Sequence, residues 1–302
     1  MINNNYFIDF TNLYEEDRDQ NMKGIYVSTN CLKNPKNVIS VLSEYEKAQI
    51  ENVELGSIHS SFDIKKLKKF NFNFLIHNYF PPPKNEFNFN LASFNKSIKK
   101  NSLDLAKRAI DMCCEIESPL YTFHAGFTVD PTKLGRPFPK NHISNRKKSL
   151  AQFFESVREL VEYSQSRGIK IAMEPNVVQK FNLVVGKNEL CLLAEFFEIK
   201  KLLKLFRKKE LGILLDLGHT VVTSHWLNFD KNKFVKNCQK RVYAVHISNN
   251  DGKQDQHKGL SKNCWQISQV KLFKNVPIIL ETMNLSTEKI KVNIQMVKDD
   301  IS

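Results

Sequence analysis

The chain has 302 residues, of which 41% are hydrophobic and 25% charged, a globular composition with enough apolar side chains for a large core. This composition excludes a disordered, collagen-like or small disulfide-stabilised protein. The formal net charge of +13 raises nucleic acid as a candidate partner.

The first 22 residues are polar and carry four acidic residues between positions 15 and 19, unlike the basic and apolar regions of a signal peptide. No apolar run approaches the roughly 20 residues of a membrane helix. The six cysteines are scattered without a CxxC pair, which favours buried thiols in a reducing compartment. We therefore expect a soluble cytoplasmic protein in which residues 1–22 form a polar extension and residues 23–302 one domain.

Short apolar segments recur along the rest of the chain, separated by longer amphipathic segments. Several of them are continuous apolar runs, which is typical of parallel strands buried on both faces. The predicted strands are Gly24–Ser28, Asn52–Leu55, Phe72–Ile76, Leu120–Phe123, Ile169–Met173, Gly212–Leu215, Val242–Val245 and Pro277–Leu280.

Helical spacing of apolar residues fills the intervals between these strands. Asn34 is placed as an N-cap, with Pro35 at the first helical position, and Gly168 stands where a helix C-cap is expected. The predicted helices are Asn34–Ala48, Ser93–Glu117, Ser144–Arg167, Lys187–Lys201, Lys231–Gln239, Gln266–Lys274 and Thr287–Lys298.

This alternation of strands and helices, with no linker of domain scale, indicates a parallel sheet. Eight such units favour closure into a barrel over an open sheet. No G-x-G-x-x-G follows the first strand, which removes the main reason to expect a dinucleotide fold. The sequence therefore predicts an α/β protein, a single-domain (β/α)8 TIM barrel.

Six consecutive predicted strands, from the third to the eighth, end in a histidine or a carboxylate. In such barrels the chemistry lies at the carboxyl ends of the strands. Imidazole and carboxylate ligands together suit zinc, manganese or a related divalent ion. The pattern predicts a metal site built from His77, His124, Glu174, Asp216 with His219, His246 followed by Asp255 and His257, and Glu281.

Other histidines and aromatic residues carry weaker signals. We expect His59, His142 and His225 to be surface side chains. Trp226 and Trp265 either line the barrel mouth or pack in the core or at the rim, and the sequence does not choose between these positions. The stiff aromatic loop 79–83 likewise either walls a small-molecule pocket or packs as part of the rim.

The order of these site residues resembles the xylose-isomerase-like barrel superfamily. That superfamily includes sugar-phosphate isomerases and epimerases and the endonuclease IV type of abasic-site nuclease. The most specific segments are 215–219, 246–257 and 279–282. One departure is that only Gly259 remains of the glycine-rich turn that usually follows the position of His257, so the shape of the last substrate loop differs.

The isomerase branch implies one divalent metal (Mn²⁺, Zn²⁺, Mg²⁺ or Co²⁺) held by Glu174, Asp216, His246 and Glu281, with His219 as a substrate contact. In that branch Glu174 and Glu281 would also act as catalytic base and acid, moving a proton through a metal-stabilised enediolate.

The nuclease branch implies three metals. His77, His124 and Glu174 would hold the first, the four isomerase ligands the second, and His219, Asp255 and His257 the third. Metal-competent residues occupy all nine positions, so ligand count does not choose between the branches. A third alternative is a barrel that binds a sugar without turning it over.

Charge composition favours the sugar branch. The basic residues are 37 lysines and only eight arginines, whereas reading of bases and phosphates favours the bidentate arginine side chain. We therefore predict a metal-dependent isomerase or epimerase of a sugar or sugar phosphate. Its expected partner is a small molecule, with nucleic acid disfavoured, no membrane partner, and a homo-oligomer left open.

Overall fold

The computed structural model describes residues 22–33, 37–56, 62–83, 85, 87–132 and 136–301. Parallel strands pair in chain order and close into a barrel, which confirms the predicted fold. The strands are β1 (Gly24–Ser28), β2 (Asn52–Leu55), β3 (Asn73–His77), β4 (Leu120–His124), β5 (Lys170–Glu174), β6 (Gly212–Asp216), β7 (Val242–Ile247) and β8 (Pro277–Leu280).

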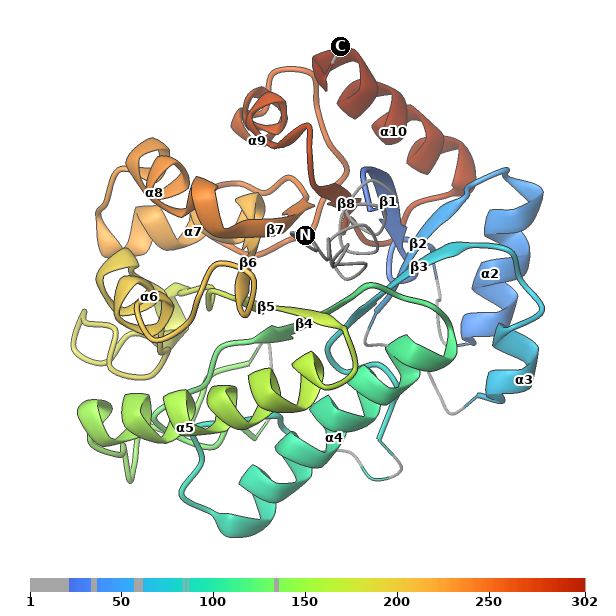
Figure 1. The fold of residues 1–302 in the computed structure, drawn as a ribbon. Coiled ribbons are helices and arrows are strands. Elements are labelled where there is room, and N and C mark those ends of the chain that lie inside the picture. The colour runs from blue at the N-terminus through green and yellow to red at the C-terminus, as the bar shows by residue number, and fades with distance from the viewer. Residues whose placement is uncertain are drawn as a thin grey trace, which may run out of the picture.

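Helices form an outer layer around the strands (Figure 1). The α-helices are α2 (Val38–Lys47), α3 (Ile64–Leu67), α4 (Lys96–Glu115), α5 (Arg146–Gln165), α6 (Phe196–Leu203), α7 (Leu217–Leu227), α8 (Lys231–Cys238), α9 (Trp265–Gln269) and α10 (Thr287–Ile301). Short 3₁₀ helices are η1 (Lys180–Asn182), η2 (Gln239–Arg241) and η3 (Val270–Phe273).

The strands β1, β2 and β8 have the predicted bounds, whereas the other five end one or two residues later than predicted. The extra residues at all five of these ends include a polar side chain expected just beyond the strand. They keep the ladder register: His124 is opposite Glu174, and Asp216 is opposite His246. Five of the nine site side chains therefore project from the sheet itself, whereas His219 lies on α7, Glu281 follows β8 directly, and Asp255 and His257 lie in the segment after β7.

Helix α2 begins later than predicted. The side chain of Asn37 caps it by accepting from the backbone N–H groups of Ile39 and Ser40. The predicted cap at Asn34 and Pro35 lies outside the described residues. At the far end of α5, Gly168 adopts a positive φ of 65° just before β5, as the sequence predicts for a helix terminus.

The predicted helix Lys187–Lys201 is wrong over its first half, because α6 begins only at Phe196. Side chains hold the preceding residues in another conformation: Asn188 accepts from the N–H of Cys191, and the Glu198 carboxylate accepts from the N–H of Leu193. Leu193 has a φ of 57°, which ends any continuous helix there. These residues form part of the cavity wall described below.

Helix α7 was not predicted as a separate element. It follows β6 without a loop, and Asp216 caps it by accepting from the N–H of His219 at 2.7 Å. Its buried residues lie on several sides, so the sequence lacks an amphipathic stripe. The predicted helix Gln266–Lys274 is also divided, into α9 and the 3₁₀ helix η3.

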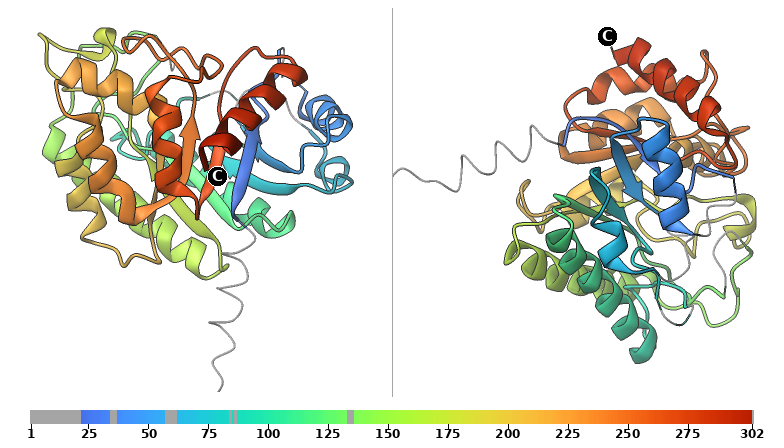
Figure 2. Two further views of the ribbon diagram at one scale, coloured as in Figure 1. Left: turned by 90° about the horizontal axis from the view of Figure 1, so that it is seen from above. Right: turned by 90° about the vertical axis from the view of Figure 1, so that its right-hand side faces the viewer.

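The apolar core forms two layers, one on each face of the closed sheet. One fills the inside of the barrel near its amino-terminal end, and the other packs between the strands and the outer helices, which flank the barrel in both views of Figure 2. The inner layer consists of Met22, Tyr26, Leu75, Leu120, Ala172, Leu214, Ala244 and Ile279. Within the described residues, no helix combines the length and apolarity that crossing a membrane requires.

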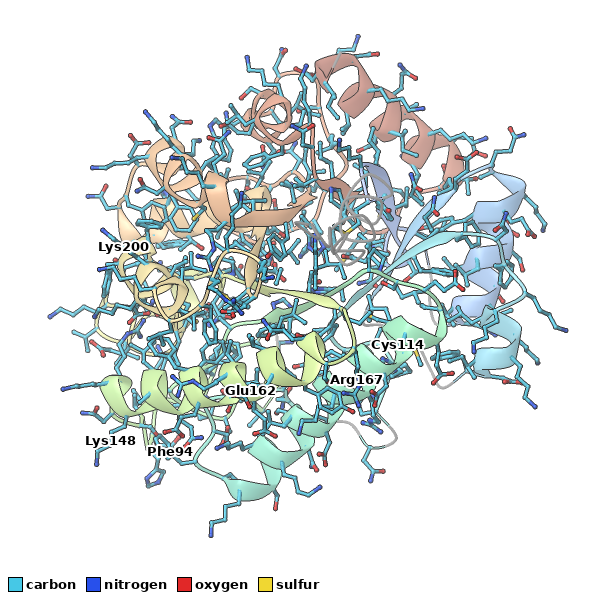
Figure 3. All side chains as sticks on the ribbon, in the orientation of Figure 1. Phe94, Cys114, Lys148, Glu162, Arg167 and Lys200 are labelled. Atoms are coloured by element: carbon cyan, nitrogen blue, oxygen red, sulfur yellow. The ribbon has the colours of Figure 1, made fainter. Side chains whose placement is uncertain are left out.

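The positive charge lies mainly on the outer helices. Lys148 on α5 and Lys200 on α6 are exposed and point away from the barrel (Figure 3). Others pair locally, such as Lys107 with Glu159 at 2.6 Å. The lysines of the described residues are therefore not confined to the barrel mouth.

Candidate metal centre and cavity

All nine site residues predicted from the sequence meet at the carboxyl end of the barrel. They form overlapping groups whose ligand atoms lie within 4.8 Å of one another. The groups are His77–His124–Glu174, Glu174–Asp216–His219, Asp216–His246–Glu281 and His219–Asp255–His257. Because neighbouring groups share residues, the nine side chains make one continuous cluster.

The first group lies over β3, β4 and β5. Glu174 Oε2 is 3.1 Å from His124 Nδ1 and 3.5 Å from His77 Nε2. The other carboxylate oxygen of Glu174 is 2.9 Å from His219 Nδ1. Glu174 is fully buried and connects the first group to its neighbours.

The second group lies over β6, β7 and β8. His246 Nδ1 is 3.0 Å from Glu281 Oε2 and 4.0 Å from Asp216 Oδ2. All three side chains are buried. This group joins Glu174 through His219, whose Nε2 is 3.6 Å from the Asp216 carboxylate.

The third group lies at the outer edge of the cluster. Asp255 Oδ2 is 3.2 Å from Nε2 of both His219 and His257. The other ring nitrogen of His257 is held by the backbone carbonyl of Glu281 at 2.9 Å. The segment 249–258 that carries these residues is itself tied by reciprocal backbone hydrogen bonds between Asn249 and Lys258.

Glu54 was missed by the sequence reasoning. It is a fully buried carboxylate on β2, and its Oε2 lies 2.8 Å from His246 Nε2. With His77 and His246 it forms a further metal-competent group. An acidic residue between Val53 and Leu55 of a predicted buried strand was the available signal, since a buried charge needs a partner.

The cluster concentrates charge in a buried place. Burial by itself raises the pKa of Glu174, but the imidazoles of His124 and His219 outweigh it and hold the pKa at about 2. Burial raises the pKa of Asp216 to about 6 against the opposing effect of His219. Burial lowers the pKa of His257, yet Asp255 and Glu281 together outweigh burial and raise the pKa to about 10. Positive charge beside the buried carboxylates therefore stabilises their ionised form.

The residues fit a divalent metal. Among the described residues, buried polar atoms without a hydrogen-bond partner include both Glu174 oxygens, Asp216 Oδ2, His219 Nδ1 and His246 Nδ1. The close approach of His219 to Glu174 is thus not aligned as a hydrogen bond. Ligand atoms that face one another without bonding are what a shared cation would satisfy, and the mixed N/O set suits Zn²⁺, Mn²⁺ or a related ion.

The histidines are also oriented as metal-binding histidines are. His77 Nδ1 contacts the Thr122 hydroxyl at 2.8 Å, His246 Nε2 contacts the Glu54 carboxylate, and His257 Nδ1 contacts the backbone carbonyl of Glu281. In each case the other ring nitrogen is left facing the carboxylates. Such outer partners fix the ring and its tautomer at metal sites.

A cavity of about 1040 Å³ opens above the cluster. His77, His124, His219 and Glu281 line its inner part. Its other lining residues include aromatic and basic side chains, namely Phe127, Phe138, Phe181, Trp226, Arg136, Lys180 and Lys253. Its volume reaches the upper end of the range for small-molecule sites, roughly 300–1,000 Å³.

The wall of this cavity has its own apolar core. Residues 125–132 and 136–145 after β4 meet residues 175–195 after β5, and an antiparallel bridge joins Phe127 to Cys191. Thr128 N–H donates to the Leu190 carbonyl at 2.9 Å. The side chains packed in the wall include Phe127, Val129, Phe138, Val178, Leu190 and Cys191. The wall is therefore a preformed part of the fold.

The remaining sequence predictions have mixed outcomes. Trp226 lines the cavity, whereas Trp265 packs against the outer core, so the two tryptophans take different positions. His142 is exposed as expected; His225 is exposed too but lines the cavity. Tyr79 packs in the rim, where its hydroxyl accepts from the N–H of Phe89. His59 lies outside the described residues.

Comparison with known proteins decides the family. The sequence profile of the family described as "Xylose isomerase-like TIM barrel" matches residues 64–296, which is most of the chain. The chain belongs to the xylose isomerase-like TIM barrel family. This confirms the resemblance inferred from the site residues.

Individual relatives point to two kinds of chemistry. "Probable endonuclease 4" of a Sulfurihydrogenibium species is 22% identical over 227 residues, which are 70% of this chain and 73% of that protein. "Fructoselysine 3-epimerase" of Shigella flexneri is 26% identical over 181 residues, which are 59% of this chain and 55% of that protein.

Solved structures support the fold. A "D-tagatose 3-epimerase-like protein" superposes with a TM-score of 0.69 and 21% identity, over 93% of this chain and all of that chain. At this identity the likeness bears on the fold alone. The relatives include enzymes of both branches, and the choice between them depends on the site.

Proposed function

We propose that this protein is a divalent-metal-dependent isomerase or epimerase of a sugar or sugar derivative. The observation that best supports this proposal is the placement of Glu174 and Glu281. They come from β5 and β8, on either side of β6 and β7, which supply Asp216 and His246. All four side chains are buried beneath a walled cavity of small-molecule size.

This arrangement suits proton transfer beside a carbonyl group. A bound divalent cation held by Glu174, Asp216, His246 and Glu281 would supply an electrophile for the carbonyl and neighbouring hydroxyl oxygens of the substrate. Glu174 and Glu281 would remove the proton and return it, one from each side of the sugar. The wall around the cavity would exclude water from the exchanging carbon.

The cavity lining favours a substrate with an anionic group. Arg136, Lys180 and Lys253 bring positive charge to a cavity whose inner end is rich in carboxylates. Aromatic faces such as Trp226 suit the apolar faces of a sugar ring. A sugar phosphate, with its ring toward the metal residues and its phosphate toward the basic side chains, fits this distribution of charge.

Exchange of substrate hydrogen with solvent tests this proposal. The full-length protein, loaded in turn with Mn²⁺, Co²⁺ or Zn²⁺, is incubated in D₂O with a panel of ketoses and ketose phosphates. We expect deuterium at a carbon next to the carbonyl of at least one substrate, detected by NMR, and its loss in Glu174→Gln and Glu281→Gln. Exchange that persists in both variants would contradict the proposed roles.

Phosphoester hydrolysis is the second candidate. The specific observation in its favour is that His77, His124, Asp255 and His257 extend the four-residue set into a chain of linked metal-competent groups. The endonuclease relative supports the same chemistry. Cleavage of a DNA duplex containing an abasic site, measured on the same metal-loaded samples, would favour this candidate, particularly with about three ions per chain.

A further inference from the structure

Glu54 has no part in the catalytic set, yet it lies against that set. Its carboxylate is fully buried on β2 and contacts His246 on the far side of the barrel interior. A buried carboxylate without a compensating partner would destabilise the folded protein, because a buried charge must be paired or hydrogen-bonded. The position therefore needs an explanation.

The geometry of His246 explains why a carboxylate is buried at position 54. Its two ring nitrogens face different carboxylates: Nε2 is 2.8 Å from Glu54 Oε2, and Nδ1 is 3.0 Å from Glu281 Oε2. The Glu54 contact satisfies hydrogen-bond geometry, whereas Nδ1 has no hydrogen-bond partner. An ionised carboxylate only accepts, so the Glu54 contact holds a proton on Nε2 and leaves Nδ1 as the ring nitrogen that can offer its lone pair to a metal ion.

We infer that Glu54 is a positioning residue that fixes the Nδ1-ligating tautomer of His246 and makes the Asp216–His246–Glu281 subsite the tightest of the linked metal subsites. This inference rests on the proposed metal dependence. Glu54 acts through His246 and touches neither substrate nor reacting atoms.

A comparison of His246 with His77 and His257 gives the expected order of metal affinity among their subsites. His77 is oriented by a neutral hydroxyl and His257 by a neutral carbonyl, whereas His246 alone among these three is oriented by a carboxylate. A carboxylate partner raises the basicity of an imidazole ligand more than a neutral acceptor does. The first metal ion should therefore occupy the His246 subsite.

Titration of the metal-free full-length protein with Co²⁺ alone tests this inference. Visible absorption of the bound ion reports coordination, and competition with a chelator gives the affinity. We expect Glu54→Leu to weaken the first equivalent by about 10–100-fold, and Glu54→Gln, whose amide oxygen still accepts, to weaken it less. Thr122→Val, which removes the partner of His77, is the matched control and should leave the first equivalent within about twofold.

A tautomer measurement adds a readout that a merely structural role would not change. In ¹⁵N-labelled protein, long-range ¹H–¹⁵N NMR should show the His246 proton on Nε2 in the wild type and in Glu54→Gln, with loss of this preference in Glu54→Leu. Glu54→Gln also covers the case in which Glu54→Leu does not fold. Unchanged Co²⁺ affinity in both Glu54 variants, or a His246 proton on Nδ1, would overturn the inference alone, whereas a wild type that binds no Co²⁺ would overturn the metal dependence as well.

Discussion

The two ends of the barrel are built from the same strands but carry different kinds of inward-facing side chain. Near the amino-terminal end the inward side chains are apolar, such as Leu214 on β6 and Ala244 on β7. Two residues further along these strands stand Asp216 and His246, both buried. The side chains of residues i and i+2 of a strand lie on the same face of the sheet. The inward face of β6 and of β7 therefore changes from apolar to charged within two residues.

The hollows at the two ends differ in the same way. Among the described residues, the lining of a hollow of about 860 Å³ at the amino-terminal end includes isoleucines and lysines, with Glu51 as its carboxylate and no histidine. The cavity at the carboxyl end is lined by histidines and carboxylates. We therefore expect the amino-terminal end to contribute to stability and the carboxyl end to the proposed chemistry, and the following variants test that division.

The largest effect is expected from the catalytic carboxylates. Glu174→Gln or Glu281→Gln should reduce proton exchange by about 10²–10⁴-fold, the usual contribution of a general acid or base. The variants should fold, because glutamine keeps the shape of the side chain. Rates from NMR exchange and a thermal melt check both points. The exposed His142→Gln serves as the matched control, and an equal loss of exchange in that variant would contradict the assignment.

The opposite pattern is expected at the amino-terminal end. Leu214→Ala removes a fully buried side chain from the inner apolar layer and should lower the free energy of unfolding by about 2–5 kcal/mol. Exchange activity of the protein that remains folded should be nearly unchanged. Denaturant unfolding gives the first quantity. Leu272→Ala, at a position that is 42% exposed, should change stability by less than about 0.5 kcal/mol; equal losses in both variants would show that the inner layer is not special.

The wall should show a mixed effect. Arg146 makes a bidentate ion pair with the buried Glu198 and also donates to the carbonyls of Asn188 and Cys191. Arg146→Ala leaves that carboxylate unpaired and should cost about 3 kcal/mol, with a raised KM because the wall loses its anchor. Unfolding and steady-state kinetics measure the two quantities. Exposed Lys147→Ala is the control, and a wall variant with normal stability would contradict the role of the pair.

The smallest effect is expected at the outer part of the cavity. Trp226 lines the cavity, and its indole N–H donates to the Lys253 carbonyl at 2.8 Å. Trp226→Ala should raise KM by about tenfold with little change in kcat, since the indole binds substrate and transition state alike. Trp265→Ala, outside the cavity, should leave KM unchanged. A selective fall in kcat for Trp226→Ala would bring this residue into the chemistry.

Much of the fold and the site could be predicted from the sequence because six of the eight strands have a histidine or a carboxylate at, or directly beyond, their carboxyl end. Glu174 and Glu281 follow apolar runs, so their positions in the barrel could be predicted before their contacts were known. Helix α7 could not be predicted, because its buried residues surround it and Asp216 serves both β6 and the helix cap.

Contacts across the barrel could not be predicted from the sequence either. Glu54 lies 192 residues from His246 along the chain, and only closure of the sheet brings them to 2.8 Å. The wall core is similar, because Phe127 meets Cys191 through a bridge between two loops that have no periodic pattern. Periodicity therefore predicts where a side chain leaves the sheet, whereas the partner it meets depends on the closed topology.

Metal content of the full-length protein, purified without chelator, is the most direct test of the proposed metal-dependent sugar chemistry. We expect about one tightly held divalent ion per chain, lost in Asp216→Asn together with proton exchange on the sugar substrate. A metal-free protein that still exchanges substrate hydrogen with solvent, at the wild-type rate and in the presence of a chelator, would contradict it.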